Sequence, residues 1–183
     1  MLVAAFGLLL MLAEPAVSQA YFEINTSYAR ACAQGAASAK AGAAVDQAAL
    51  AACTASVSTE PLSPLGMAQT LTNRGVIKFV ANDRAGAFAD FSAALKQQKD
   101  FAPAYLNRAA IHMAAERYNE ALADADRAVQ LDNTNARAWL MRGGANELLG
   151  RTTQAYKDYQ AAARADPSWD RPKAELARFT VKK

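Results

Sequence analysis

The sequence is poor in the residues from which metal sites and active sites are usually built. Its 183 residues include one histidine and two cysteines. Because a zinc site needs about four Cys, His or carboxylate ligands, we expect no metal site and no cofactor. The sequence also has no glycine-rich phosphate loop and no Gly-x-Ser-x-Gly turn, so no residue stands out as catalytic. These absences argue against an enzyme.

An excess of charge of one sign is also missing. The chain has 20 Lys and Arg residues against 17 Asp and Glu residues, which gives a formal net charge of +3. Basic and acidic side chains are spread along the chain together, whereas a protein that binds nucleic acid usually gathers its basic residues into a patch. We therefore expect no nucleic-acid partner.

Aromatic residues make up only 8% of the chain, although 52% of its residues are hydrophobic. Much of the hydrophobic content is alanine, which is small and the best helix former. The length is sufficient for one domain with a hydrophobic core. This composition favours an all-α fold of closely packed helices over a β-sandwich.

One long apolar run lies near the start of the chain, from Leu2 to Ala13, and small residues follow it at Ser18 and Ala20. A helix that spans a bilayer needs about 20 apolar residues, so the shorter run is interpreted as a signal peptide over residues 1–20. We expect an exported protein, periplasmic or secreted, without a membrane span after signal removal. No Lys or Arg precedes the run, unlike in most signal peptides. A start codon further upstream and an uncleaved interfacial anchor are the alternatives.

A later part of the chain, residues 68–169, repeats itself with a period of 34 residues. The short segments Asn73-Arg74-Gly75, Asn107-Arg108-Ala109 and Met141-Arg142-Gly143 follow this period, and so do the alanines at positions 87, 121 and 155. Small residues at recurring positions allow two antiparallel helices to approach closely. The period therefore predicts three helix pairs, in units 68–101, 102–135 and 136–169, which together span 68–169.

The period and its motif resemble the tetratricopeptide-repeat (TPR) family. The residues that match the family pattern in the third unit are Trp139, Gly143, Ala155, Tyr159, Ala162 and Pro167. The resemblance implies an α-α superhelix, a solenoid of three clear repeats. His112 replaces a tyrosine of the family pattern, and we expect it to be packed and hydrogen-bonded rather than catalytic.

The family usually has leucine where this chain has arginine, at the seventh position of each unit. Each arginine has a carboxylate sixteen residues later, which predicts ion pairs between helices: Arg74 with Asp90, Arg108 with Asp124, and Arg142 with Asp158. We interpret these pairs as structural. The alternative is a row of arginines that binds anions.

The segments that flank the repeats are also predicted to be helical. Residues 21–58 are expected to form a degenerate helical hairpin, a zeroth repeat, and residues 59–67 a linker. The sequence midpoint of Cys32 and Cys53 falls at the hairpin's turn, so we expect a disulfide between them. Residues 170–183 are expected to form a capping helix and tail, which a solenoid end requires.

In the TPR family, the first helix of each unit lines a concave groove that receives a peptide or a helix. The family's groove positions correspond here to Val76, Phe79, Leu106, Asn107, Met113, Arg137, Leu140, Glu147 and Leu148. This lining is largely apolar, so the resemblance implies a protein-interaction scaffold for a peptide or an amphipathic helix. Two alternatives are a groove filled by the chain's own Tyr21-Phe22, and a structural or accessory subunit of an envelope or secretion complex with no free groove.

Overall fold

The computed structural model describes residues 28–179, and all regular structure in that range is helical, as the composition predicts. The predicted signal peptide, Tyr21-Phe22 and the last four residues of the predicted tail lie outside the described residues. A helical segment at 28–40 comes first. The helices that follow are α2 (Gln47–Thr59), α3 (Pro64–Val80), α4 (Arg84–Gln97), α5 (Ala102–Ala114), α6 (Tyr118–Leu131), α7 (Ala136–Leu148), α8 (Thr152–Ala165) and α9 (Asp170–Ala177).

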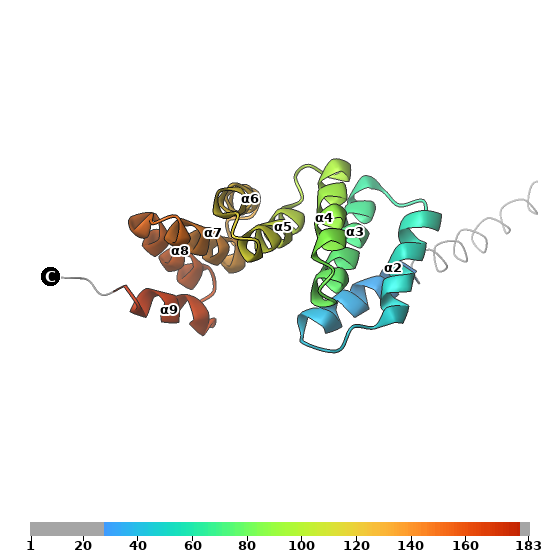
Figure 1. The fold of residues 1–183 in the computed structure, drawn as a ribbon, viewed down its shortest axis with the longest axis horizontal. Coiled ribbons are helices and arrows are strands. Elements are labelled where there is room, and N and C mark those ends of the chain that lie inside the picture. The colour runs from blue at the N-terminus through green and yellow to red at the C-terminus, as the bar shows by residue number, and fades with distance from the viewer. Residues whose placement is uncertain (1–27, 180–183) are drawn as a thin grey trace, which may run out of the picture.

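The helices pack as pairs that stack along one direction (Figure 1). The pairs are α3 with α4, α5 with α6, and α7 with α8, and the second helix of each pair packs on the first helix of the next element. The first helices also touch one another, α3 with α5 and α5 with α7. This arrangement is the α-α superhelix that the 34-residue period predicts.

Close approach within each pair depends on two matched positions. A Cβ atom added at Gly75 would lie 2.5 Å from Cε1 of Phe91. In the next pair the two equivalent positions are Ala109 and Ala125, both fully buried, so a small partner there leaves room for a methyl group. The chain thus places glycine opposite an aromatic ring and alanine opposite alanine.

The turn inside each pair has the same backbone shape in all three pairs. The residue with a left-handed conformation is Asn82 (φ 65°), Glu116 (φ 58°) or Gly150 (φ 74°), and these positions are again 34 residues apart. Glycine adopts this conformation without strain, asparagine tolerates it, and glutamate does so at a cost. The backbone therefore keeps its period where the sequence departs from the best turn residue.

The predicted linker 59–67 is shorter in the structure, because α2 continues to Thr59 and α3 already begins at Pro64. The side chain of Ser63 accepts a hydrogen bond from the backbone N–H of Gly66 at 3.1 Å. Serine is a preferred N-cap residue and proline suits the first helical turn, so the Ser63-Pro64 pair starts the helix one turn before the repeat motif begins.

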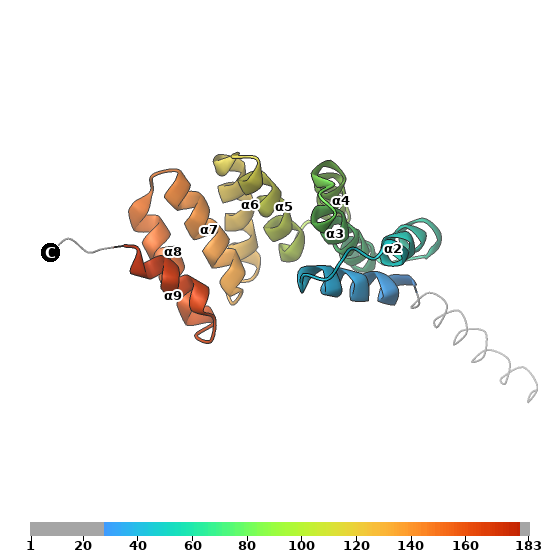
Figure 2. The same ribbon diagram turned by 60° about the horizontal axis from the view of Figure 1, so that its bottom comes forward.

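A disulfide between Cys32 and Cys53 joins the helical segment 28–40 to α2. Both cysteines are fully buried, and they share one core cluster with Ala36, Val76 and Ile77. Figure 2 shows the segment 28–40 (blue) beneath α2 and α3. The disulfide-linked hairpin therefore packs directly on the first helix of the first pair.

Candidate functional site

The three predicted ion pairs are all present, each between the first and second helix of one pair. Nε and Nη2 of Arg74 donate to the two carboxylate oxygens of Asp90 at 2.9 and 2.7 Å. Arg108 donates to Asp124 in the same manner, at 2.7 Å for both bonds. Nη2 of Arg142 donates to Asp158 at 2.7 Å. We call these three pairs the Arg–Asp ladder.

The ladder also connects neighbouring helix pairs. Nη1 of Arg142 donates to Asp126 on α6 at 2.7 Å, and Nη1 of Arg108 makes a longer contact of 3.4 Å to the hydroxyl of Ser92 on α4. The aspartates at the centre of the ladder are nearly buried, with side-chain exposures of 5% for Asp90 and Asp158 and 9% for Asp124. Because the guanidinium groups already donate hydrogen bonds to these carboxylates, the arginines are better explained by a structural role than by the binding of external anions.

His112 lies beside the ladder in a packed environment. It is 8% exposed, and its ring meets the ring of Phe88 edge-on at 5.4 Å. Its Nε2 atom is 3.7 Å from Asp124, which is too long for a hydrogen bond, and its buried Nδ1 atom has no hydrogen-bond partner among the described residues. The predicted packing is thus observed, while the predicted hydrogen bonding is wrong, because the carboxylate of Asp124 is held by Arg108.

The predicted groove is covered at the first helix pair. Val76 is 5% exposed and belongs to the same core cluster as Cys32 and Ala36, and Phe79 packs against that cluster. Both residues were expected in an open groove; Val76 is instead buried in the cluster that contains the cysteines of the disulfide-linked hairpin, whereas Phe79 is half-buried at the edge of that cluster. The reason is that the hairpin packs the small residues of segment 28–40 on this side of α3, and the repeat pattern alone does not specify the path of that segment.

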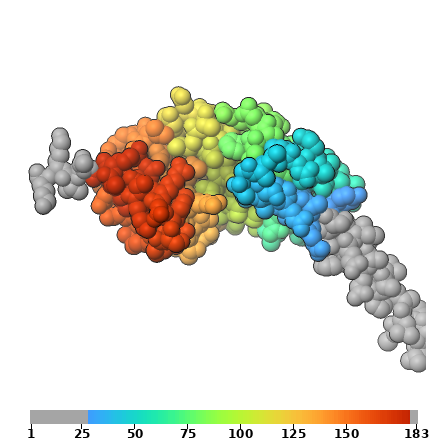
Figure 3. All heavy atoms as spheres, turned by 90° about the horizontal axis from the view of Figure 1, so that it is seen from below, coloured from blue at the N-terminus to red at the C-terminus, as the bar shows by residue number. Residues whose placement is uncertain are grey.

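The equivalent positions in the second and third pairs remain accessible. Leu106, Asn107, Met113 and Leu140 are half-buried, Arg137 is exposed, and Leu148 is 53% exposed. We define the α5–α7 face by its apolar and small residues, Leu106, Ala110, Met113, Leu140, Gly144 and Leu148. Figure 3 looks onto this side of the molecule: the hairpin (blue to cyan) and α9 (red) stand forward at its two ends, and α5 (yellow-green) is set back between them.

Glu147, another predicted groove residue, is already engaged by the chain itself. Its carboxylate accepts hydrogen bonds from the hydroxyl of Tyr159 at 2.6 Å and from Nη2 of Arg178 at 2.8 Å. Burial, reinforced by the bond to Glu147, raises the pKa of the Tyr159 hydroxyl, which therefore stays protonated. Phe179 packs against the Tyr159 ring at 5.8 Å and helps to close this end of the face.

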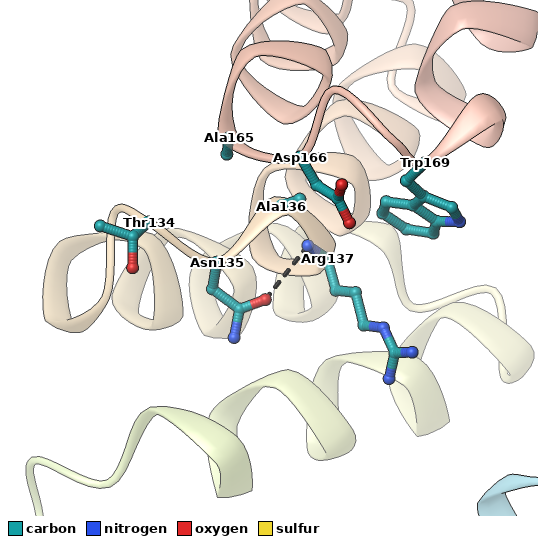
Figure 4. A pocket seen from close by; sticks show the side chains of 7 residues that line it. All are labelled: Thr134, Asn135, Ala136, Arg137, Ala165, Asp166 and Trp169. Atoms are coloured by element: carbon teal, nitrogen blue, oxygen red, sulfur yellow. Dashed lines mark hydrogen bonds between the residues drawn. The ribbon is translucent and has the colours of Figure 1, made fainter.

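A cavity of about 480 Å3 opens at the other end of α7 (Figure 4). The residues that line it are Thr134, Asn135, Ala136, Arg137, Ala165, Asp166 and Trp169. The side chain of Asn135 accepts a hydrogen bond from the backbone N–H of Arg137 at 3.1 Å and so caps α7. Of these residues, only Arg137 was predicted from the sequence to belong to a binding site.

A repeated turn could have pointed to the rest of this cavity. Oδ1 of Asp132 accepts a hydrogen bond from the backbone N–H of Thr134 at 3.1 Å. Oδ1 of Asp166 likewise accepts one from the backbone N–H of Ser168 at 3.0 Å. Both turns read Asp-x-Ser/Thr and lie 34 residues apart. A second cavity of about 480 Å3 lies over α6 and α8 and includes Arg142 and Asp158 of the ladder among its lining residues.

Within residues 28–179, no cluster of three or more His, Cys, Asp or Glu side chains is arranged to hold a metal ion. None of the helices described in that range combines the length and the apolar character needed to cross a membrane.

Comparisons with known proteins agree with the helical arrangement. Two family models, each described as a tetratricopeptide repeat, match the chain, one over residues 102–135 and the other over residues 136–168. No curated protein matches the sequence.

Three solved structures illustrate the similarity in fold. The TPR domain of OM64 from Arabidopsis superposes with a TM-score of 0.60 at 25% identity, over 63% of this chain and 95% of that one. The first TPR domain of Spaghetti (RPAP3), solved with the HSP90 peptide SRMEEVD bound, gives 0.60 at 22% identity, over 62% of this chain and 90% of that one. The RS-1 ArsTM double mutant of MamA gives 0.65 at 18% identity, over 88% of this chain and 82% of that one.

Proposed function

Since the chain belongs to the tetratricopeptide-repeat protein family, we propose that it is an exported protein-interaction module whose α5–α7 face binds a peptide or an amphipathic helix of a partner protein. The family's fold generally serves protein interaction, and the proposal assigns no reaction to the chain. Three of the similar structures were solved with peptides bound: the first and second TPR domains of Spaghetti (RPAP3) with the HSP90 peptide SRMEEVD, and the second TPR domain of human RPAP3 with the HSP70 peptide SGPTIEEVD.

The observation that carries this proposal is a difference between equivalent positions. Thr72 and Val76 on α3 are 4% and 5% exposed, whereas Leu106 and Leu140, the equivalents of Thr72, are only half-buried. The hairpin covers the first pair and leaves the next two uncovered. Accessible apolar side chains gathered on one face are typical of protein-interaction sites.

Two features support export. The apolar run from Leu2 to Ala13 has the length of a signal peptide core. The disulfide between Cys32 and Cys53 suits an oxidising compartment, because structural disulfides are rare where thiols are kept reduced. N-terminal sequencing of the protein recovered from its native host tests this part: a start near Tyr21 supports export, and an intact apolar run argues against cleavage.

The experiment for binding is affinity capture from an envelope fraction with wild-type protein and with the variant Leu106→Glu, Met113→Glu. Both side chains lie on the α5–α7 face and are half-buried. We expect the variant to lose the specific partner while its circular dichroism spectrum stays helical. Equal recovery of the partner by both proteins would reject the α5–α7 face as the binding surface.

A second candidate function is a structural or accessory subunit of an envelope assembly with no free groove. Two features favour an accessory subunit: the hairpin covers the first helix pair, and Arg178 already binds the carboxylate of Glu147. Gel filtration separates the two functions. A stoichiometric complex that survives dilution supports the assembly subunit, and weak, exchangeable peptide binding supports the interaction module.

A further inference from the structure

Three positions on the first helices are equivalent by the repeat, and their side chains become smaller along the solenoid. They are Val76, Ala110 and Gly144, each 34 residues from the next. Val76 is covered by the hairpin, whereas Ala110 and Gly144 are partly exposed. Because the helices around them repeat regularly, the loss of side-chain volume should leave space over the second and third pairs for a partner side chain.

Gly144 is not required by packing, unlike its neighbour Gly143. A Cβ atom at Gly143 would lie 2.7 Å from Cε1 of Tyr159, so no larger residue fits there without a shift. A Cβ atom at Gly144 would meet only Cε of Met113 at 3.5 Å and the Tyr159 hydroxyl at 3.9 Å, which are ordinary contacts. Glycine inside a helix costs about 1 kcal/mol relative to alanine. The chain bears this cost at Gly144 without a packing reason among the described residues.

The rim of this space is apolar and adaptable. Leu106 and Leu140 stand beside it at equivalent positions of α5 and α7, and Met113 reaches Gly144 from α5. Methionine has a flexible, polarisable side chain that adjusts to different apolar partners. A large apolar side chain of a partner would therefore find contacts on three sides.

Two cations stand at one edge of the same face. Arg137 lies three residues before Leu140 and seven before Gly144, which places it on the same side of α7. Figure 4 shows its guanidinium extending away from the capping Asn135 toward α5. Lys40 is the exposed last residue of the helical segment 28–40, and it lies near enough to Arg137 for the two charges to interact. Neither Lys40 nor Arg137 forms an ion pair with any residue in the range 28–179.

The two charges affect each other. Partial burial, and then the positive charge of Arg137, hold the pKa of Lys40 below its ordinary value. Two cations that repel one another gain from a carboxylate placed between them, since the anion offsets the repulsion and pairs with both. Charge complementarity thus favours an acidic residue in the partner at this edge.

We propose that the α5–α7 face binds an acidic, amphipathic partner segment, which seats one large apolar side chain over Ala110 and Gly144 and places a carboxylate between Lys40 and Arg137. This inference rests on the proposed function and adds the chemistry of the partner. It also makes the disulfide-linked hairpin part of the binding site, because the hairpin carries Lys40 in addition to covering Val76.

A phage library of random peptides, panned against the oxidised full-length protein, tests this chemistry. We expect the selected peptides to contain a large apolar residue with Asp or Glu close by. Synthetic copies of these peptides should bind at least about tenfold more weakly to Gly144→Leu, which fills the space, and to Lys40→Gln, Arg137→Gln, which removes the charges. The controls are Ala123→Leu and Arg164→Gln, both at exposed positions on second helices, and these should bind as wild type does.

The possible results separate this inference from the proposed function. One result would overturn the inference alone. In it, the selected peptides bind Leu106→Glu more weakly than wild type, but they bind Gly144→Leu and the double charge variant with the affinity of wild type. Failure to select any peptide would overturn both. If Gly144→Leu does not fold, Gly144→Ala takes its place, because its Cβ makes only ordinary contacts, and the expected loss of affinity is smaller.

Discussion

Gly143 and Tyr159 face each other so closely that a Cβ atom at Gly143 would lie 2.7 Å from Cε1 of the tyrosine ring. We expect Gly143→Ala to destabilise the protein by about 1 to 3 kcal/mol, because the ring or a helix must move. Thermal unfolding followed by circular dichroism measures the effect. The same change should cost far less in a Tyr159→Ala background, which imitates Ala109 and Ala125 of the neighbouring pair. Equal losses in both backgrounds would show that the ring is not the cause.

The Arg–Asp ladder should matter for stability and not for binding. Arg108→Ala leaves Asp124, with 9% of its side chain exposed, without its arginine. An unpaired carboxylate at a largely buried position costs about 2 kcal/mol or more, so we expect a lower urea midpoint. Peptides selected on the α5–α7 face should still bind the folded variant. An unchanged midpoint together with lost binding would instead support the interpretation of the arginines as anion-binding groups.

The protonation of His112 should lower the free energy of unfolding of the protein in mild acid. Burial, partly opposed by the charge of Asp124, holds the pKa of His112 below its ordinary value of 6.5. The unfolded chain therefore takes up a proton at a higher pH than the folded protein does. Stability should fall as the pH drops below about 6.5 and should stop falling, for this group, below the folded pKa.

Urea unfolding at a neutral and a mildly acidic pH measures this dependence. His112→Gln removes the titrating ring, so its midpoint should change less between the two conditions than that of wild type. An identical change in both proteins would assign the pH dependence to other groups.

Glu116 adopts a left-handed backbone conformation, with φ at 58°, at a turn position where the third pair has Gly150. A residue with a Cβ atom pays about 1 to 2 kcal/mol for this conformation, and glycine does not. Glu116→Gly should therefore raise the melting temperature. The reverse change, Gly150→Glu, is the matched control and should lower it. If both substitutions lowered the melting temperature, the side chain of Glu116 would have to contribute more than its backbone costs.

The repeat period predicts the helix pairs well, because one pattern of small and large residues specifies the contacts inside each pair. Matched positions such as Gly75 with Phe91 and Arg74 with Asp90 belong to one unit, so their spacing is visible in the sequence. Contacts between distant segments are different. The burial of Val76 depends on where residues 28–40 run, and the repeat contains no information on that segment.

The same limit applies to the candidate site. Leu106 and Leu140 follow from the family's positions, since they lie on regular first helices. The engagement of Glu147 by Arg178 joins residues 31 positions apart and involves the end of the chain beyond the repeats. The cavity beside Arg137 needs Trp169, whose place is fixed by the turn before α9 and not by a helix period.

The connections between neighbouring helix pairs are unequal. Arg142 reaches across to the carboxylate of Asp126 at 2.7 Å, whereas the equivalent contact of Arg108 goes to the neutral hydroxyl of Ser92 at 3.4 Å. Both bonds have an ionised donor, but the Arg142 bond also has an ionised acceptor and is shorter, so it is the stronger of the two. The junction between α4 and α5 is accordingly weaker than the junction between α6 and α7. A pulling force should part it before the other, and amides that face it should exchange their hydrogens sooner.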